Sequence, residues 1–142
     1  MKLLIVLPLA LGLIATTAYA RTLEGTTWRT STGSGTIRIE ACGTKTCGKI
    51  LSGAPRPGDT ATTGGLDNKN PKSALRTRSL IGLTILSNFT RQADNSYKGG
   101  TIYNPEDGKT YRSEFKLKRD GNLEVKGCVG PFCQAQIWTP VR

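Results

Sequence analysis

The chain has 142 residues, a formal net charge of +10 at pH 7, four cysteines and no histidine. That length suits one domain with one modest core. Without histidine the chain cannot form a Ser-His-Asp or Cys-His catalytic arrangement, and it lacks the commonest metal ligand. We therefore expect a protein that is not an enzyme and that holds no metal and no cofactor.

Residues 1–20 have the pattern of a cleaved signal peptide. Lys2 precedes an apolar run from Leu3 to Ala15, and Ala18-Tyr19-Ala20 is a small-x-small cleavage site. An uncleaved membrane anchor is the alternative, but about 13 apolar residues span only about 20 Å of helix against a hydrocarbon core of about 30 Å. We expect cleavage after Ala20, export, and a mature domain over residues 21–142 with no membrane span.

The mature chain remains strongly basic. It carries a charge of about +9 once Lys2 is removed with the signal peptide. Such a charge favours anionic partners, for example lipid head groups or acidic envelope polymers, although a solvated basic surface explains it equally well. Nucleic acid is not expected, because no basic cluster is interleaved with exposed aromatic residues.

Short alternating runs bounded by Gly, Asn, Asp and Pro predict an all-β domain. One connection, from Gly53 to Ser79, is far longer than a hairpin loop, and Asn70-Pro71 begins a short helix within it. The eight predicted strands lie at residues 25–31, 35–41, 47–52, 80–87, 96–103, 109–118, 122–128 and 133–139.

Two x-Asp-Gly turns allow the hairpins to be registered, because directly opposed residues share a face and should suit one another. Both turns fit three-residue loops in which glycine supplies the left-handed residue. Across residues 119–121 the predicted pairs are Leu117–Leu123, Phe115–Val125, Lys116–Glu124 and Glu114–Lys126. Across residues 106–108 they are Tyr103–Tyr111, Thr101–Ser113 and Gly99–Phe115.

The cysteines form two x4-spaced pairs, and an even count in an exported domain favours two disulfides. A zinc site is disfavoured without histidine, and a thioredoxin-like centre would need Cys-x-x-Cys. Three pairings are possible, and the hairpin registers favour the local ones, Cys42–Cys47 and Cys128–Cys133. The cross-strand pairs expected beside them are Ile39–Ile50 and Glu40–Lys49, and then Leu123–Trp138 and Val125–Gln136 with Ile137 outward.

Eight antiparallel strands joined by tight turns can close an up-and-down barrel, which is either filled by side chains or holds one small ligand. The predicted inward face mixes apolar residues with polar ones, including Tyr97, Thr101, Tyr103, Tyr111, Ser113, Gln134 and Gln136. Candidate ligand contacts are Tyr103, Tyr111 and Gln136. The alternative is that these polar groups satisfy one another or face solvent.

The long connection supplies two further kinds of candidate. Arg76 and Arg78 suit a carboxylate or phosphate, although Arg76 pairing with Asp67 is an equally good interpretation. Asp67 and Asn70 are expected to order the loop through side-chain to backbone hydrogen bonds.

Many ordered motifs across the mature chain match a known family. They are Gly25 with Trp28, Cys42 to Gly48, Asp67 to Pro71, Leu75 to Arg78, Gly82-Leu83, Gly99 to Pro105, Gly108 to Tyr111, Gly127-Cys128 and Gln136 to Trp138. On these residues the chain resembles the DUF2147 family, small exported bacterial proteins of uncharacterised role. The resemblance implies a periplasmic, lipocalin-like barrel that binds a small molecule, although Gly25 and Trp28 are spaced one residue wider than the Gly-x-Trp of lipocalins.

We therefore expect a monomeric periplasmic barrel that binds a small hydrophobic or amphipathic ligand. An anionic ligand is also compatible with the sequence. The alternative is an interaction or inhibitor module that acts on an envelope partner through its basic outer surface.

Overall fold

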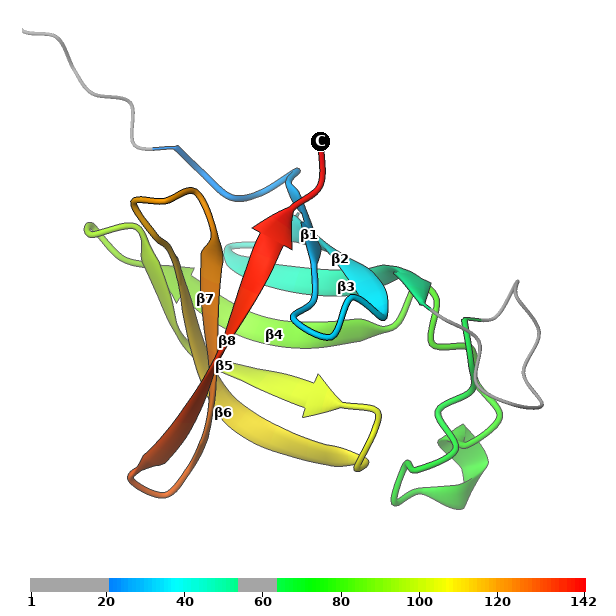
Figure 1. Cartoon of the computed structure of the whole chain (residues 1–142). Coiled ribbons are helices and arrows are strands. Elements are labelled where there is room, and N and C mark those ends of the chain that lie inside the picture. The colour runs from blue at the N-terminus through cyan, green and yellow to red at the C-terminus, as the bar shows by residue number, and fades with distance from the viewer. Residues whose placement is uncertain (1–20, 54–63) are drawn as a thin grey trace, which may run out of the picture.

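The computed structural model describes residues 21–53 and 64–142, and these form a closed antiparallel barrel (Figure 1). The predicted signal peptide lies outside the described residues. The strands are β1 (Thr27–Arg29), β2 (Gly35–Cys42), β3 (Lys45–Gly53), β4 (Thr84–Arg91), β5 (Ser96–Asn104), β6 (Lys109–Leu117), β7 (Leu123–Val129) and β8 (Phe132–Pro140). Each strand pairs with the next, and β1 closes the barrel against β8. The predicted all-β, eight-stranded, up-and-down barrel is confirmed.

The connection between β3 and β4 carries a single 3-10 turn, Ser73–Leu75, in the part that the structure describes. The short helix predicted after Asn70-Pro71 is therefore present, but only as this one turn. Its preceding residue, Lys72, makes no side-chain cap; instead the Lys72 N–H donates to Asn70 Oδ1 at 2.9 Å. We call residues 64–83 the β3–β4 connection below.

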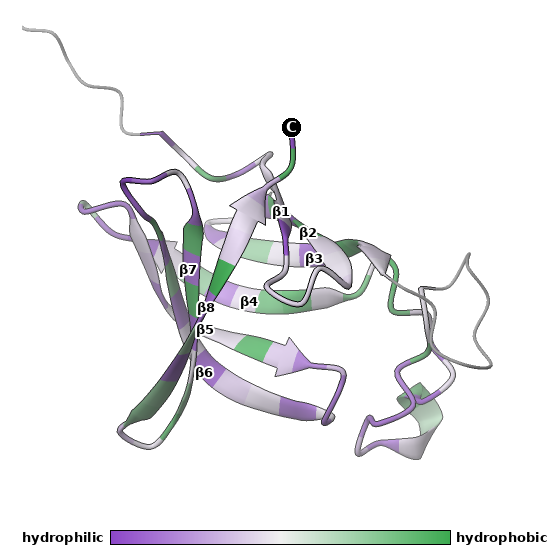
Figure 2. Ribbon diagram, in the orientation of Figure 1, coloured by the Kyte–Doolittle hydropathy of each residue, from purple (hydrophilic) through white to green (hydrophobic). Residues whose placement is uncertain are grey.

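Two hairpin registers follow the sequence prediction. In β6–β7, Leu117 pairs with Leu123 and Glu114 with Lys126, whose ammonium lies 3.3 Å from the Glu114 carboxylate. In β7–β8, Cys128 pairs directly with Cys133, with 4.0 Å between their Cα atoms. Along β7 hydrophobic and hydrophilic residues alternate, as the bands of colour in Figure 2 show.

The β2–β3 register differs from the prediction by two residues. Cys42 pairs with Lys45, and Ile37 rather than Ile39 pairs with Ile50. The turn between the strands is shorter than expected because Gly43, at φ +63°, allows a two-residue loop. A shift of two keeps every side chain on its face, so the Cys42–Cys47 disulfide still forms, diagonally, with 5.8 Å between Cα atoms.

The β5–β6 register differs by one residue, which is a more serious error. Tyr103 pairs with Thr110, and Tyr111 pairs with Ile102. The turn spans four residues, 105–108, and is closed by Gly108 N–H donating to the Asn104 carbonyl at 2.8 Å. A shift of one puts Tyr103 and Thr101 on the opposite face from the predicted one. Tyr103 nevertheless still lines the mouth of the barrel, because it lies at the end of β5.

Further along β5 a bulge changes the register again, so that Tyr97 points into the barrel. The register shifts between Tyr97 and Gly100, and Tyr97 then pairs with Phe115. Tyr97 and Phe115 stack inside the barrel with ring centroids 4.7 Å apart, and the centroid of the Phe89 ring also lies 4.7 Å from that of Phe115, at a tilt of 56°. Together with Ile39, Leu86 and Leu123 these aromatic rings fill one end of the barrel, which we call the closed end.

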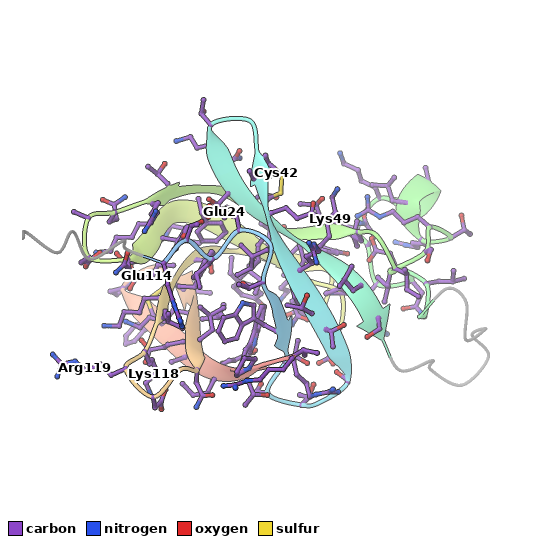
Figure 3. The ribbon with its side chains drawn as sticks, turned by 90° about the horizontal axis from the view of Figure 1, so that it is seen from above. Glu24, Cys42, Lys49, Glu114, Lys118 and Arg119 are labelled. Carbon is purple, nitrogen blue, oxygen red and sulfur yellow. A yellow bond between two sulfur atoms is a disulfide. The ribbon has the colours of Figure 1, made fainter. Side chains whose placement is uncertain are left out.

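The outer surface carries the charge. In Figure 3, seen from above, Lys118 and Arg119 extend from the rim of the barrel, and the Cys42 sulfur lies on the outside of its wall. Within the described residues, no helix is long and apolar enough to cross a bilayer.

Candidate ligand cavity

The end of the barrel opposite the aromatic core is open and contains a cavity of about 830 Å³. Residues of the β1–β2 and β5–β6 turns, the adjoining ends of β7 and β8, and Gly64 and Leu80 of the β3–β4 connection surround it, so all of these segments meet at one mouth. The volume lies within the range of about 300–1,000 Å³ that is typical of small-molecule sites. The barrel is therefore filled at one end and hollow at the other.

The deep wall of the cavity is apolar. One side chain from each of six strands lines it: Ile37, Ile50, Ile85, Ile102, Val125 and Trp138. Most of these are shielded from solvent, and Trp138 is almost fully buried. An apolar ligand or an alkyl chain would be removed from water here, which is the main favourable term in such binding.

Uncharged polar groups lie along β8. Gln134 and Gln136 point inward because they alternate with Ala135 and Ile137, which point out. Gln136 Oε1 accepts hydrogen bonds from the Trp138 indole at 3.1 Å and from the Ser31 hydroxyl at 3.5 Å, so the oxygen is engaged and the N–H₂ group is the donor that Gln136 can offer. These residues can orient the polar end of a ligand without a formal charge.

The rim carries a tyrosine–carboxylate pair. Tyr111 donates its hydroxyl to Asp107 Oδ2 at 2.5 Å, and Asp107 Oδ1 accepts from Lys109 N–H at 2.9 Å. The Asp107 bond raises the pKa of Tyr111. Burial alone would raise the pKa of Asp107, but the bonds from Tyr111 and Lys109 outweigh it and lower that pKa. Tyr111 therefore contributes its ring to the wall while its hydroxyl is engaged.

One hydroxyl on the inner face is buried without a partner. Ser113 lies between Gly100 and Gly127 in the sheet, and its Oγ makes no hydrogen bond within the described part of the chain. Gly127 itself lines the cavity. A buried hydroxyl of this kind is costly unless a ligand or water group pairs with it.

Outside the barrel, Asp67 organises the β3–β4 connection. Its carboxylate is 0% exposed and accepts hydrogen bonds from Asn70 Nδ2 at 2.8 Å, Arg78 Nε at 2.8 Å and the Tyr103 hydroxyl at 2.5 Å. Burial, followed by the bond to Asp67, raises the pKa of Tyr103. Tyr103 therefore fastens the connection to the outside of β5, and only part of it reaches the cavity rim.

The two candidate arginines do not point into the cavity. Arg78, not Arg76, pairs with Asp67, since the Leu66–Ser79 bridge and the Asp67 N–H to Arg78 carbonyl bond set those two residues side by side. Arg76 donates from Nε to the Asn70 carbonyl at 2.8 Å. No lysine or arginine occurs among the described residues that line the cavity.

Several cavity residues escaped the sequence analysis. Val129 and Phe132 line the mouth, as do Glu106 and the polar turn of Thr30 to Ser34. Their alternation does not identify them, because they lie in turns or at strand ends. One sequence feature could have identified part of the mouth. The turn Val129-Gly130-Pro131-Phe132 is apolar, whereas turns are usually polar.

The comparisons with known proteins agree with this architecture. A family model described as an uncharacterized protein conserved in bacteria (DUF2147) matches residues 26–140. The solved structure of protein HP1028 from Helicobacter pylori, titled as belonging to the lipocalin family, is similar with a TM-score of 0.70 and 26% sequence identity over 85% of each chain. None of the curated proteins compared with the chain matches it.

Proposed function

The chain belongs to the DUF2147 family of bacterial proteins, and from that premise we propose that it is an exported binding protein that carries one small ligand in its barrel. The observation that carries the proposal is the open cavity of about 830 Å³ with an apolar depth and a polar rim. The likeness to a structure titled as a lipocalin supports it, since barrels of this kind enclose small ligands.

The lining narrows the chemistry of the ligand. Isoleucines and Trp138 suit an apolar body, and the amides of Gln134 and Gln136 suit a neutral polar end. An anionic end would meet no basic side chain among the described lining residues, whose charged members are Glu106 and Asp107. We therefore propose an uncharged apolar or amphipathic ligand rather than an anion bound by Arg76 and Arg78.

The proposed place of action is the periplasm. Two disulfides form in the structure, Cys42–Cys47 and Cys128–Cys133, and such bonds persist in oxidising compartments. This supports the signal peptide predicted at residues 1–20, with the mature domain beginning after Ala20. In this interpretation the protein binds and transports or shields its ligand and performs no chemistry on it.

Fluorescence titration with the neutral apolar probe N-phenyl-1-naphthylamine tests the proposal. Gly127→Phe places a ring in the cavity, because a Cβ there meets its nearest neighbours, Ile102 and Tyr111, only at 3.7 Å. Ala135→Phe adds the same ring to the outer face of β8. We expect Gly127→Phe to weaken probe binding at least about tenfold and Ala135→Phe to leave it unchanged.

A displacement series identifies the ligand class. Dodecanol should displace the probe at lower concentration than dodecanoate does, because only the alcohol has a neutral end. The proposal is wrong if the wild-type protein binds no probe, or if both phenylalanine variants bind it as the wild type does. Stronger displacement by dodecanoate would restore the anionic ligand.

A further inference from the structure

The hairpin tip between β7 and β8, which we define as Val129, Gly130, Pro131 and Phe132, is apolar and exposed. Phe132 is 80% exposed and Val129 65%, and the two residues pair directly across the hairpin. Figure 2 shows this end of the hairpin in the colour of hydrophobic residues. Apolar side chains that lie together on a surface usually mark a contact with a partner or a membrane.

The hairpin tip is held in this exposed position. The Cys128–Cys133 disulfide closes its base, and the Arg112 guanidinium donates a hydrogen bond to the Gly130 carbonyl. Both restraints oppose a movement of the four residues over the barrel that would bury Phe132. The hairpin is therefore a stiff apolar projection rather than a collapsed turn.

The projection lies at the mouth of the ligand cavity. Val129 and Phe132 are themselves lining residues, as are Gly64 and Leu80 at the ends of the β3–β4 connection. Figure 1 shows the hairpin tip and this connection reaching the same end of the barrel, away from the chain's C-terminus. Whatever contacts the hairpin tip therefore also contacts the entrance to the cavity.

Exposed basic side chains share this end of the molecule. They comprise Lys69, Lys72 and Arg76 in the β3–β4 connection together with Lys109 and Arg112 on β6. The exposed acids of the described rim are Glu106 and Asp107, while Asp67 is buried against Arg78. The described outer surface around the mouth is thus net basic and surrounds an apolar centre, which is the pattern of a surface that contacts anionic lipids.

We propose that the hairpin tip docks the barrel on the surface of an anionic lipid bilayer. Phe132, Val129 and Pro131 enter the boundary between head groups and acyl chains, and the basic side chains of the rim meet lipid phosphates. Docking in this orientation turns the cavity mouth toward the bilayer, so an apolar ligand could pass between them without crossing water. The contact itself does not depend on whether the cavity is loaded.

Vesicle co-sedimentation tests the docking. The mature protein should bind vesicles of phosphatidylcholine with 30% phosphatidylglycerol. Binding should be weaker to vesicles of pure phosphatidylcholine, and high salt should weaken binding to the anionic vesicles. The double variant Val129→Ser with Phe132→Ser should bind at least about tenfold more weakly. Ile137→Ser, which removes an exposed apolar side chain from the outer face of the same strand, should bind as the wild type does.

Circular dichroism should show that the double variant keeps the wild-type fold, because both side chains are exposed. The proposal is overturned if the wild-type protein ignores the anionic vesicles, or if the folded double variant binds them as well as the wild type. Selective capture of a protein partner through the hairpin tip, without vesicle binding, would also overturn it. Each of these results leaves the cavity proposal standing, because that proposal is judged by probe binding alone.

Discussion

The Asp67 carboxylate shows how one residue can organise a long connection. It is fully buried, and its two oxygens accept from Asn70, Arg78 and Tyr103. These donors and the positive charge of Arg78 offset the cost of removing the carboxylate from water. The connection is thus fastened both to itself and to β5.

We predict that Asp67→Asn lowers the free energy of unfolding by about 2 kcal/mol, because the amide removes the negative charge and turns one acceptor into a donor facing other donors. The loss should be smaller than for a wholly buried ion pair, since the Arg78 side chain is 37% exposed and can reach water. Urea unfolding measures the change.

Glu40→Gln is the matched control. It breaks the exposed pair with Lys49, at 3.2 Å, and should cost less than about 0.5 kcal/mol. An Asp67→Asn variant that is no less stable than Glu40→Gln would show that the Asp67 cluster does not hold the connection.

For the β3–β4 connection the sequence predicts which residues order the loop better than it predicts the side chains with which they pair. Asp67 and Asn70 were chosen for loop chemistry, and the structure places both in the buried cluster. The sequence offers Arg76 as one possible partner of Asp67, whereas the structure pairs Asp67 with Arg78. This pairing depends on the Leu66–Ser79 bridge, and no periodic sequence pattern predicts such a bridge. The face of Tyr103 depends on the β5–β6 register, which the sequence predicts one residue away from the observed pairing.

Among the strands, turn length decided which registers could be predicted. The 119–121 turn has its predicted length, and four charge and apolar pairs followed correctly from it. The 105–108 turn holds one residue more than expected, and this exchanged the faces of Tyr103 and Thr101. Local sequence did not reveal the difference, since both turns contain Asp-Gly.

The bulge in β5 contains Gly99, whose φ of +77° is left-handed, and Gly100 directly after it makes a close contact with β4. A Cβ on this residue would lie 2.5 Å from a ring carbon of Phe89 and 2.5 Å from the Ser87 carbonyl oxygen. Phe89 is fully buried and packed against Phe115, so it cannot move away. Gly100 therefore lets β4 and β5 approach while the bulge turns Tyr97 inward.

We predict that Gly100→Ala destabilises the protein by about 2–4 kcal/mol through this overlap. Gly127→Ala is the control, because its nearest neighbours lie 3.7 Å from the added carbon and its backbone is not left-handed. That variant should be neutral or slightly stabilised, since alanine restricts the unfolded chain. Thermal unfolding of both variants decides the matter, and an equal effect of the two substitutions would contradict the tight contact.

The whole barrel divides along its axis into a packed half and a hollow half. Phe89, Tyr97 and Phe115 occupy the closed end, and the cavity occupies the other. Sequence alternation could show that the inward face was mixed, but not how the mixture was distributed along the axis. That distribution depends on the stagger of eight strands, which only closure of the barrel sets.

The division predicts unequal costs for truncating two inward side chains on neighbouring strands. Phe115→Ala should cost about 3–5 kcal/mol, because it empties a space in a close-packed cluster. Ile102→Ala should cost about 1 kcal/mol or less, because Ile102 already borders the cavity and has fewer packing partners to lose. The same Ile102→Ala substitution should weaken binding of the apolar probe, since it removes ligand-facing surface.

Urea unfolding and probe titration on both variants separate the effect on stability from the effect on binding. Equal unfolding costs at Phe115 and Ile102 would mean that the hollow half collapses around its side chains, and the barrel would then have no room for a ligand.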